Sequence, residues 1–215
     1  HSRGQVIDHR FKRLALVGVG HGLAQGAQPQ IKKGSGSTAL LTIRSAGCLV
    51  RGLSFNGGSA TGGGILLDDD GGTAKNAFGT IIEECFFKNC VGSTATDAAT
   101  GGAINWPSVG NAWQVRISRN RFYKNVGDIV MKGTTASVPQ DVVIEKNIFS
   151  SPAGSVHINI YVAADGIGGL IIDDNVFPVL PALGGSSNPR FYNLAAGCLG
   201  ILSNNRFGST ALTFG

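Results

Sequence analysis

Ile117-Ser-Arg-Asn120-Arg-Phe122 is the clearest copy of a six-residue phrase that the chain repeats: an aliphatic residue, two mostly polar residues, usually Asn, any residue, then Phe. Three more copies end in the same way, at Ile144–Phe149, Ile172–Phe177 and Leu202–Phe207. Two earlier copies, Val50–Phe55 and Ile82–Phe87, carry Leu53 and Cys85 at the Asn position. The six Phe residues are 32, 35, 27, 28 and 30 residues apart. A repeat of this length in β-type residues predicts a stack of coils.

The phrase also predicts how each coil is built. Val142 and Ile144 share one face of a strand and Val143 shares the other with Glu145, because side chains alternate along a strand. We expect a tight bend at the Asn, since Asn tolerates left-handed backbone angles. Stacking would place the four ladder asparagines one above another, where each side-chain amide can bond its neighbour at the ~4.8 Å strand spacing. These residues are Asn120, Asn147, Asn175 and Asn205.

A second apolar strand follows each phrase. We expect these strands at residues 64–67, 102–106, 128–131, 156–162 and 191–194, with irregular first turns at 14–19 and 39–43. No long window has a helical apolar period, and the 33 glycines suit many sharp corners. Counting the irregular turns, the chain predicts about seven coils.

This pattern resembles the right-handed parallel β-helix of the pectate-lyase-like superfamily over roughly residues 12–215. The resemblance implies an all-β, single-stranded solenoid. Phage tailspikes and tail fibres, polysaccharide lyases, polygalacturonases and bacterial surface adhesins share this fold, so the fold alone does not choose a function. Phe86-Phe87-Lys88-Asn89 and Phe122-Tyr-Lys-Asn125 also resemble the Phe-x-x-Asn repeat of chlamydial-type polymorphic membrane proteins, which favours a cell-surface module.

We expect one domain over residues 1–215, with a basic arm and irregular first coil at 1–35 and regular coils at 36–215, as a segment of a longer protein. Another strand-like stretch at 211–214 suggests that more protein or another subunit covers that end. The net charge of +5 lies in residues 1–33, which hold six Lys/Arg against Asp8. Nucleic acid is not an expected partner, because Phe11 is the one aromatic residue that interleaves these charges. The sequence contains no run of 18 apolar residues, so it predicts no membrane-spanning helix.

When coils stack, the equivalent positions of successive repeat phrases form columns on the outer faces. The column four residues before the Asn position reads Leu49, Ile81, Arg116, Val143, Ile171 and Ile201. Five of these six residues are apolar where solvent is expected, which suggests burial against other copies of the chain. Phage tailspikes bury such faces by forming trimers, so the resemblance implies a homotrimer. The alternatives are a covering loop of the same chain or a slipped register.

Two groups of carboxylates are candidate catalytic or metal-binding residues. Glu145 and Asp173 would be neighbours one coil apart, a separation that suits a retaining glycosidase, and their repulsion would raise one pKa. Asp68, Asp69 and Asp70 close a strand and could bind Ca²⁺, the metal that lyases of this superfamily use; an acidic turn is the alternative. We otherwise expect no cofactor. In the nearby columns, Glu84 should pair with Arg119 and Lys146 with Asp174.

The four cysteines, Cys48, Cys85, Cys90 and Cys198, lack zinc-ligand spacing, and the sequence leaves a disulfide and free thiols equally open. Loops of unequal length could line a groove for an extended glycan, with Trp106, Trp113 and Tyr161 as candidates for stacking on sugars. Packing against a coil is the alternative for each aromatic residue.

These observations favour a phage tailspike or tail-fibre segment, extracellular or on the virion, that contacts bacterial surface polysaccharide. A secreted polysaccharide lyase or glycoside hydrolase and an autotransporter-like adhesin passenger on the bacterial surface are the alternatives.

Overall fold

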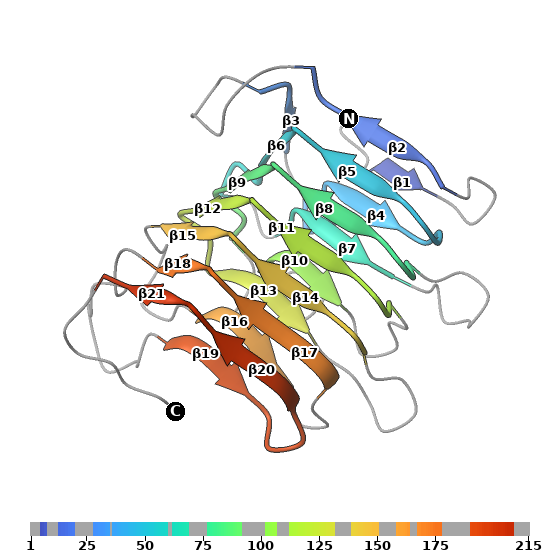
Figure 1. Cartoon of the computed structure of the whole chain (residues 1–215). Helices are drawn as coiled ribbons and strands as arrows, with labels where there is room; N and C mark the ends of the chain where they lie inside the picture. The colour runs from blue at the N-terminus through green and yellow to red at the C-terminus, as the bar shows by residue number, and fades with distance from the viewer. Residues whose placement is uncertain are drawn as a thin grey trace.

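The structure, a computed structural model of the 215-residue chain, describes residues 5–7, 13–19, 28–34, 36–59, 62–68, 77–91, 102–106, 112–131, 139–150, 158–163, 167–177 and 190–208. These residues form strands and no helix. The strands make three sheets of seven strands each, and every strand pairing within them is parallel. The chain passes from sheet A to sheet B to sheet C and then returns to sheet A (Figure 1).

Sheet A contains β1 (Gln5–Ile7), β4 (Leu41–Ile43), β7 (Ile65–Leu67), β10 (Gly102–Trp106), β13 (Gly127–Met131), β16 (Ile158–Val162) and β19 (Arg190–Leu194). Sheet B contains β2 (Ala15–Val17), β5 (Leu49–Arg51), β8 (Ile81–Glu83), β11 (Arg116–Ser118), β14 (Val143–Glu145), β17 (Gly168–Asp173) and β20 (Leu199–Ser203). Sheet C contains β3 (Gln30–Lys32), β6 (Ser54–Asn56), β9 (Phe86–Lys88), β12 (Arg121–Tyr123), β15 (Ile148–Ser150), β18 (Val176–Phe177) and β21 (Arg206–Phe207).

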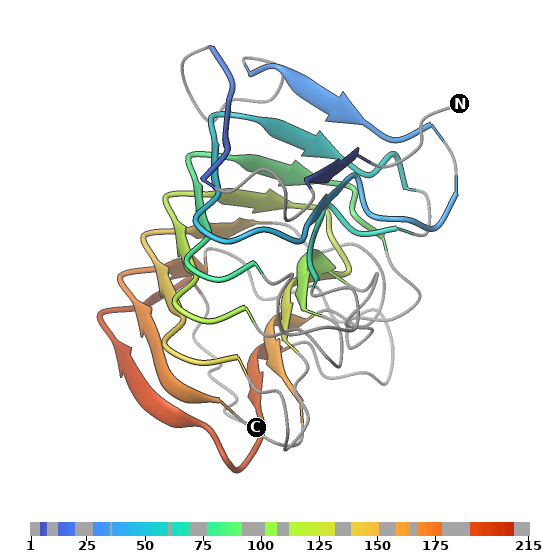
Figure 2. The ribbon, with the colours of Figure 1, turned by 90° about the vertical axis from the view of Figure 1, so that its right-hand side faces the viewer.

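This architecture confirms the predicted all-β solenoid of stacked parallel strands, similar to a parallel β-helix. Successive coils lie one on another along the stack, as the colour sequence of Figure 2 shows. The repeat phrase forms the last part of a sheet B strand, the corner and the start of a sheet C strand. The expected second strands are the strands of sheet A. In the N-terminal segment, β1, β2 and β3 already join all three sheets, so its described residues belong to the stack.

The corner between sheets B and C differs from the prediction in one respect. The left-handed residue is the one before the Asn, not the Asn itself: φ is 54° at Arg119, 55° at Lys146, 49° at Asp174 and 52° at Asn204. Gly52 occupies the same position one coil after Gly18, with φ of 67°. A single left-handed residue turns the chain, and the following Asn is then buried at the corner, where it can bond backbone groups.

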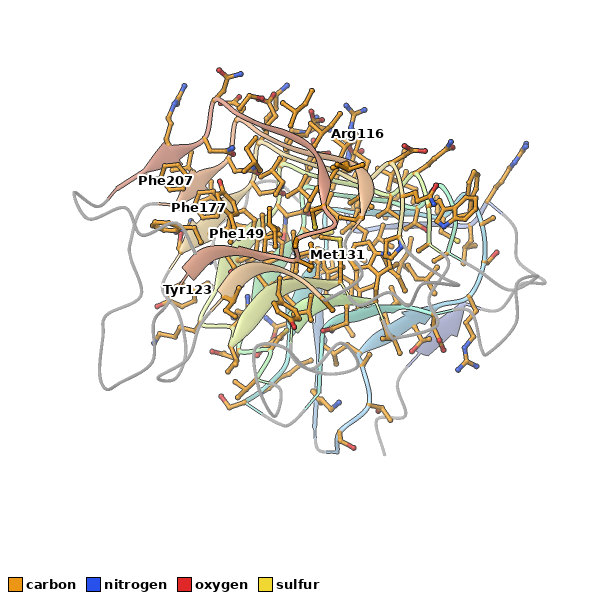
Figure 3. The ribbon with its side chains drawn as sticks, turned by 90° about the horizontal axis from the view of Figure 1, so that it is seen from below. Arg116, Tyr123, Met131, Phe149, Phe177 and Phe207 are labelled. Atoms are coloured by element: carbon orange, nitrogen blue, oxygen red, sulfur yellow. The ribbon has the colours of Figure 1, made fainter. Side chains whose placement is uncertain are left out.

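The interior is a set of columns that run along the stack. One column is a stack of phenylalanine rings from sheet C: Phe55, Phe87, Phe122, Phe149, Phe177 and Phe207. Neighbouring ring centroids are 4.7–5.3 Å apart and the rings are within 11° of parallel. Figure 3 shows Phe149, Phe177 and Phe207 in this row. The aliphatic residue of every phrase except the last is buried beside it, as at Ile117, Ile144 and Ile172, whereas Leu202 is exposed. The predicted alternation is confirmed, since Val142 and Ile144 are buried while Val143 and Glu145 are half-buried.

Candidate functional site

The Asn column is a continuous hydrogen-bonded ladder. Asn120 donates its backbone N–H and its side-chain Nδ2 to Asn147 Oδ1, at 2.9 and 3.1 Å. Asn147 donates in the same way to Asn175, and Asn175 to Asn205, at 2.9–3.0 Å. Each Nδ2 also donates to the carbonyl of the aliphatic residue one coil earlier, as Asn147 does to Ile117 at 3.0 Å. Asn120, Asn147 and Asn175 are fully buried, so these bonds satisfy polar groups that water cannot reach.

In the coil before Asn120, cysteines occupy the Asn-like positions of two successive corners, and Cys85 is the one in the ladder column. The Cys85 backbone N–H donates to Asn120 Oδ1 at 2.9 Å, and its thiol lies 3.7 Å from the Val50 carbonyl, where an Asn would place Nδ2. Cys90 has the same relation to Asn125 at the next corner, because its N–H donates to Asn125 Oδ1 at 3.0 Å. Burial raises the pKa of both thiols to about 12. All four cysteines, Cys48 and Cys198 included, are free thiols.

The Cys90–Asn125 pair corrects the register of the Phe-x-x-Asn resemblance. Phe87, not Phe86, pairs with Phe122, so Asn125 matches Cys90. Asn89 matches Lys124 instead, and both are left-handed, with φ of 53° and 52°. The two sequence copies are therefore one residue out of step in the structure.

The outer face of sheet B carries the predicted apolar column. Leu49, Ile81, Arg116, Val143, Ile171 and Ile201 are aligned by strand pairing. Each is exposed or half-buried, and each precedes an inward residue of the repeat phrase. Arg116 interrupts the row and points away from the core in Figure 3. Its guanidinium binds Glu145 at 2.8–2.9 Å, so the row is divided by an ion pair.

Beside this row lies a cluster of four charges, Arg51, Glu83, Glu84 and Arg119. Arg51 binds Glu84 at 2.8 Å and lies 3.7 Å from Glu83. Arg119 contacts Glu83 and binds Glu84 at 3.3 Å, which confirms the predicted Glu84–Arg119 pair. The hydrogen bond from Arg51 is the main cause of a lowered Glu84 pKa. Among the described residues Lys146 makes no ion pair with Asp174; Arg206 lies 4.0 Å from Asp174 instead.

Glu145 and Asp173 are neighbours in register, but each already has its own partners. Glu145 binds Arg116, and Asp173 accepts hydrogen bonds from Ser203 Oγ at 2.7 Å and Asn204 Nδ2 at 2.9 Å. These two donors lower the pKa of Asp173. The expectation that repulsion raises a pKa is therefore wrong for Asp173, because hydrogen-bond donors stabilise its charge.

Asp68 lies beside an arginine that sequence reasoning missed. Arg44, at the end of β4, donates Nε and Nη2 to Asp68 Oδ2 at 2.8 Å each. The alignment of β4 with β7 could have indicated this contact, since each residue directly follows its strand. Asp69 and Asp70 lie outside the described residues. In the described part of the chain no three His, Cys, Asp or Glu side chains are grouped to hold a metal ion.

The three aromatic candidates for sugar stacking have different surroundings. Trp106 is fully buried and its indole N–H donates to the Ala112 carbonyl at 3.4 Å, so its proposed role in stacking on a glycan is wrong. Trp106 is the last residue of β10, and the alternating pattern turns it into the core. Tyr161 is half-buried on sheet A, and Trp113 is 40% exposed.

Trp113 has an aromatic neighbour that sequence reasoning missed. Phe78 is 36% exposed and occupies the same corner, between sheets A and B, one coil earlier. The Gly47 N–H donates to the Phe78 carbonyl at 2.7 Å, and the Gly79 N–H donates to the Trp113 carbonyl at 2.8 Å. The number of residues between the two corners does not indicate that Phe78 and Trp113 occupy the same position in successive coils.

The described residues contain no helix that could span a membrane. Comparison with known protein families, curated proteins and solved structures finds no match to this chain.

Proposed function

We propose that this chain is a structural and receptor-binding stalk of the phage tailspike or tail-fibre type. It forms a right-handed parallel β-helix of about seven coils. It acts outside the cell, on the virion, as a homotrimer that contacts bacterial surface polysaccharide. The observation that carries the binding function is the pair of exposed aromatic side chains, Phe78 and Trp113, on one corner of the stack.

A glycan is the ligand class that this corner suits. Sugar rings have apolar faces that pack on aromatic rings and hydroxyl groups that need polar partners. The next residues of the same corner supply polar groups, because Gln114, Gln140 and Asp141 are all exposed. The Gln114 N–H donates to the Gln140 carbonyl at 2.9 Å, which sets Gln140 one coil after Trp113. An extended polymer lying along the stack would meet aromatic residues first and amide and carboxylate groups next.

The apolar row of sheet B supports the trimer. Ile81 and Ile201 are 37% and 57% exposed on that face. Association of three such faces would remove these side chains from water, while the neighbouring Arg51–Glu84 pairs would set the register of the contact.

An array of purified bacterial O-polysaccharides and capsular polysaccharides tests the binding site. The chain should bind a subset of the array, and Trp113→Ala should weaken binding by about fivefold or more. Lys124→Ala is the matched control, since Lys124 is exposed at a different corner and packs on Tyr123. Unchanged binding by Trp113→Ala would contradict the site.

Light scattering tests the assembly and separates the other function classes. A trimer supports the stalk, whereas a monomer at high concentration favours the adhesin passenger. Appearance of unsaturated or reducing products from an acidic glycan would favour a lyase or hydrolase. Calcium does not fit the described residues alone, because Arg44 already neutralises Asp68, the one carboxylate described there.

A further inference from the structure

The corner that carries Phe78 and Trp113 also carries an exposed carboxylate, that of Asp141. Asp141 lies one coil after Gln114, because the Gln114 N–H donates to the Gln140 carbonyl at 2.9 Å. Trp113 immediately precedes Gln114, so the indole ring and the carboxylate belong to adjacent coils, which are about 4.8 Å apart. These two exposed side chains can therefore meet the same ring-sized ligand.

The backbone of this corner does not require an acid at position 141. Its stacked left-handed residues are Arg13, Gly47, Gly79, Gln114, Asp141 and Gly169, with φ between 53° and 69°. Asp tolerates this conformation, but the Arg, Gln and Gly residues of the other coils adopt it as well. The turn geometry alone therefore does not account for the carboxylate of Asp141.

The Asp141 carboxylate is available to a ligand. Among the described residues no cation or hydrogen-bond donor binds it. Arg116 lies two residues after Gln114 on the neighbouring coil, and it binds Glu145 at 2.8–2.9 Å instead. An ionised carboxylate has two acceptor oxygens and makes stronger hydrogen bonds than a neutral acceptor.

Glycines leave space on either side of the two side chains. A Cβ added at Gly168, in the coil after Asp141, would meet no atom within 4 Å. At Gly169 an added Cβ would collide with Asp141 Oδ1, so the carboxylate lies across the bare backbone of Gly169. Gly79, two coils before Asp141, is as open as Gly168. The corner therefore has room for a ligand before and after the indole and the carboxylate.

We propose, on the basis of the glycan-binding function above, that Trp113 and Asp141 form one subsite for a neutral sugar unit. The apolar face of the sugar ring packs on the indole, and two adjacent hydroxyl groups donate hydrogen bonds to the Asp141 carboxylate. An acidic sugar is excluded, because its carboxylate would face that of Asp141 with no described cation between them. Trp113 supplies contact area, and Asp141 supplies selectivity.

Matched polysaccharides test this selectivity. The neutral O-polysaccharides that the chain binds are compared with the same polymers after selective oxidation of their primary hydroxyl groups to carboxylates. Biolayer interferometry should show binding of the oxidised polymers that is weaker by about tenfold or more. The difference should shrink at high salt, because the facing charges are exposed and screened. Equal or tighter binding of the oxidised polymers at low salt, or binding of acidic polysaccharides alone, would overturn the proposal.

Asp141→Asn isolates the carboxylate, since Asn also tolerates the left-handed backbone. This variant should bind the neutral polymers about fivefold more weakly and prefer them by only about twofold, because the charge is lost. Asp174→Asn is the matched control: Asp174 is left-handed too, with φ of 49°, and its side chain is 39% exposed at the corner between sheets B and C. The control should keep both the affinity and the preference. If Asp141→Asn also keeps the full preference, the proposal is wrong.

Trp113→Ala separates this proposal from the binding function on which it rests. If Trp113→Ala weakens binding of the neutral and the oxidised polymers while Asp141→Asn keeps the preference, the corner binds glycans and only the neutral-sugar subsite is wrong. If Trp113→Ala binds both polymers as tightly as the unchanged chain, the corner is not the binding site and both proposals fail.

Discussion

Asn147 Oδ1 accepts two hydrogen bonds from Asn120, one from the backbone N–H at 2.9 Å and one from the side-chain amide at 3.1 Å. One oxygen therefore satisfies the corner backbone of the coil before it and also holds the Asn side chain of that coil. Because the arrangement repeats at Asn175 and Asn205, each coil specifies the position of the next. The ladder is a polar counterpart to the phenylalanine stack that runs alongside it.

Asn147→Ala should lower the free energy of unfolding by about 3–5 kcal/mol, since three buried groups lose a partner. These are the Asn120 N–H, the Asn120 amide and the Ile117 carbonyl. Chemical denaturation followed by circular dichroism measures the change. Asn205→Ala should cost less, about 1–2 kcal/mol, because water reaches this half-buried position. Equal losses at both positions would contradict a buried ladder.

Cys85→Asn should preserve stability within about 1 kcal/mol, because an Asn amide can donate to the Val50 carbonyl and to Asn120 Oδ1. The Cys85 N–H and thiol already point to these two acceptors. Cys85→Asp is the matched control, since it has the same shape without the donors. At neutral pH it should be much less stable than Cys85→Asn.

The Asp variant has a pH dependence of defined sign. A buried carboxylate facing acceptors has its folded-state pKa raised above the unfolded value. Its stability should therefore rise as the pH falls through that raised pKa, while the Asn variant changes little. An Asp variant as stable as the Asn variant at neutral pH would show that the Cys85 site is not a ladder position.

Phe122→Ala should cost about 3–5 kcal/mol, because the ring is fully buried between two others. Its centroid is 5.2 Å from Phe87 and 4.8 Å from Phe149. Phe122→Leu should cost less, since it keeps most of the apolar volume. Phe207→Ala, at the half-buried end of the stack, should also cost less than Phe122→Ala; a larger loss there would mean that the end is covered.

Glu84 should titrate below its ordinary pKa of 4.5, because Arg51 and Arg119 stabilise the carboxylate. Its contribution to stability is present above that ordinary value and is lost as the pH falls through the lowered pKa. Carbon-13 NMR of the side-chain carboxyl group measures this titration. Arg51→Gln should move the pKa of Glu84 upward, and Arg206→Gln, outside the cluster, should not. The shift should shrink at high salt, because the pair is solvent-exposed.

The repeat phrase alone determined the architecture. Alternation placed Ile117 and Ile144 inside, and the recurrence of Asn and Phe at a nearly constant spacing predicted two columns along a stack. These features follow from local chemistry, since strand geometry fixes the direction of each side chain and equal coils bring equal positions together.

The corner geometry and the contacts outside the repeat phrase needed the tertiary structure. The left-handed residue before each Asn is a property of the corner backbone, whereas the burial of Trp106, the Arg44–Asp68 pair and the Phe78–Trp113 corner depend on which residues of separate coils meet. Loop lengths vary from coil to coil, so sequence spacing does not give that register. Similarly, the half-buried state of Asn205, unlike the full burial of Asn175, follows from its position in the last described coil and not from its place in the phrase.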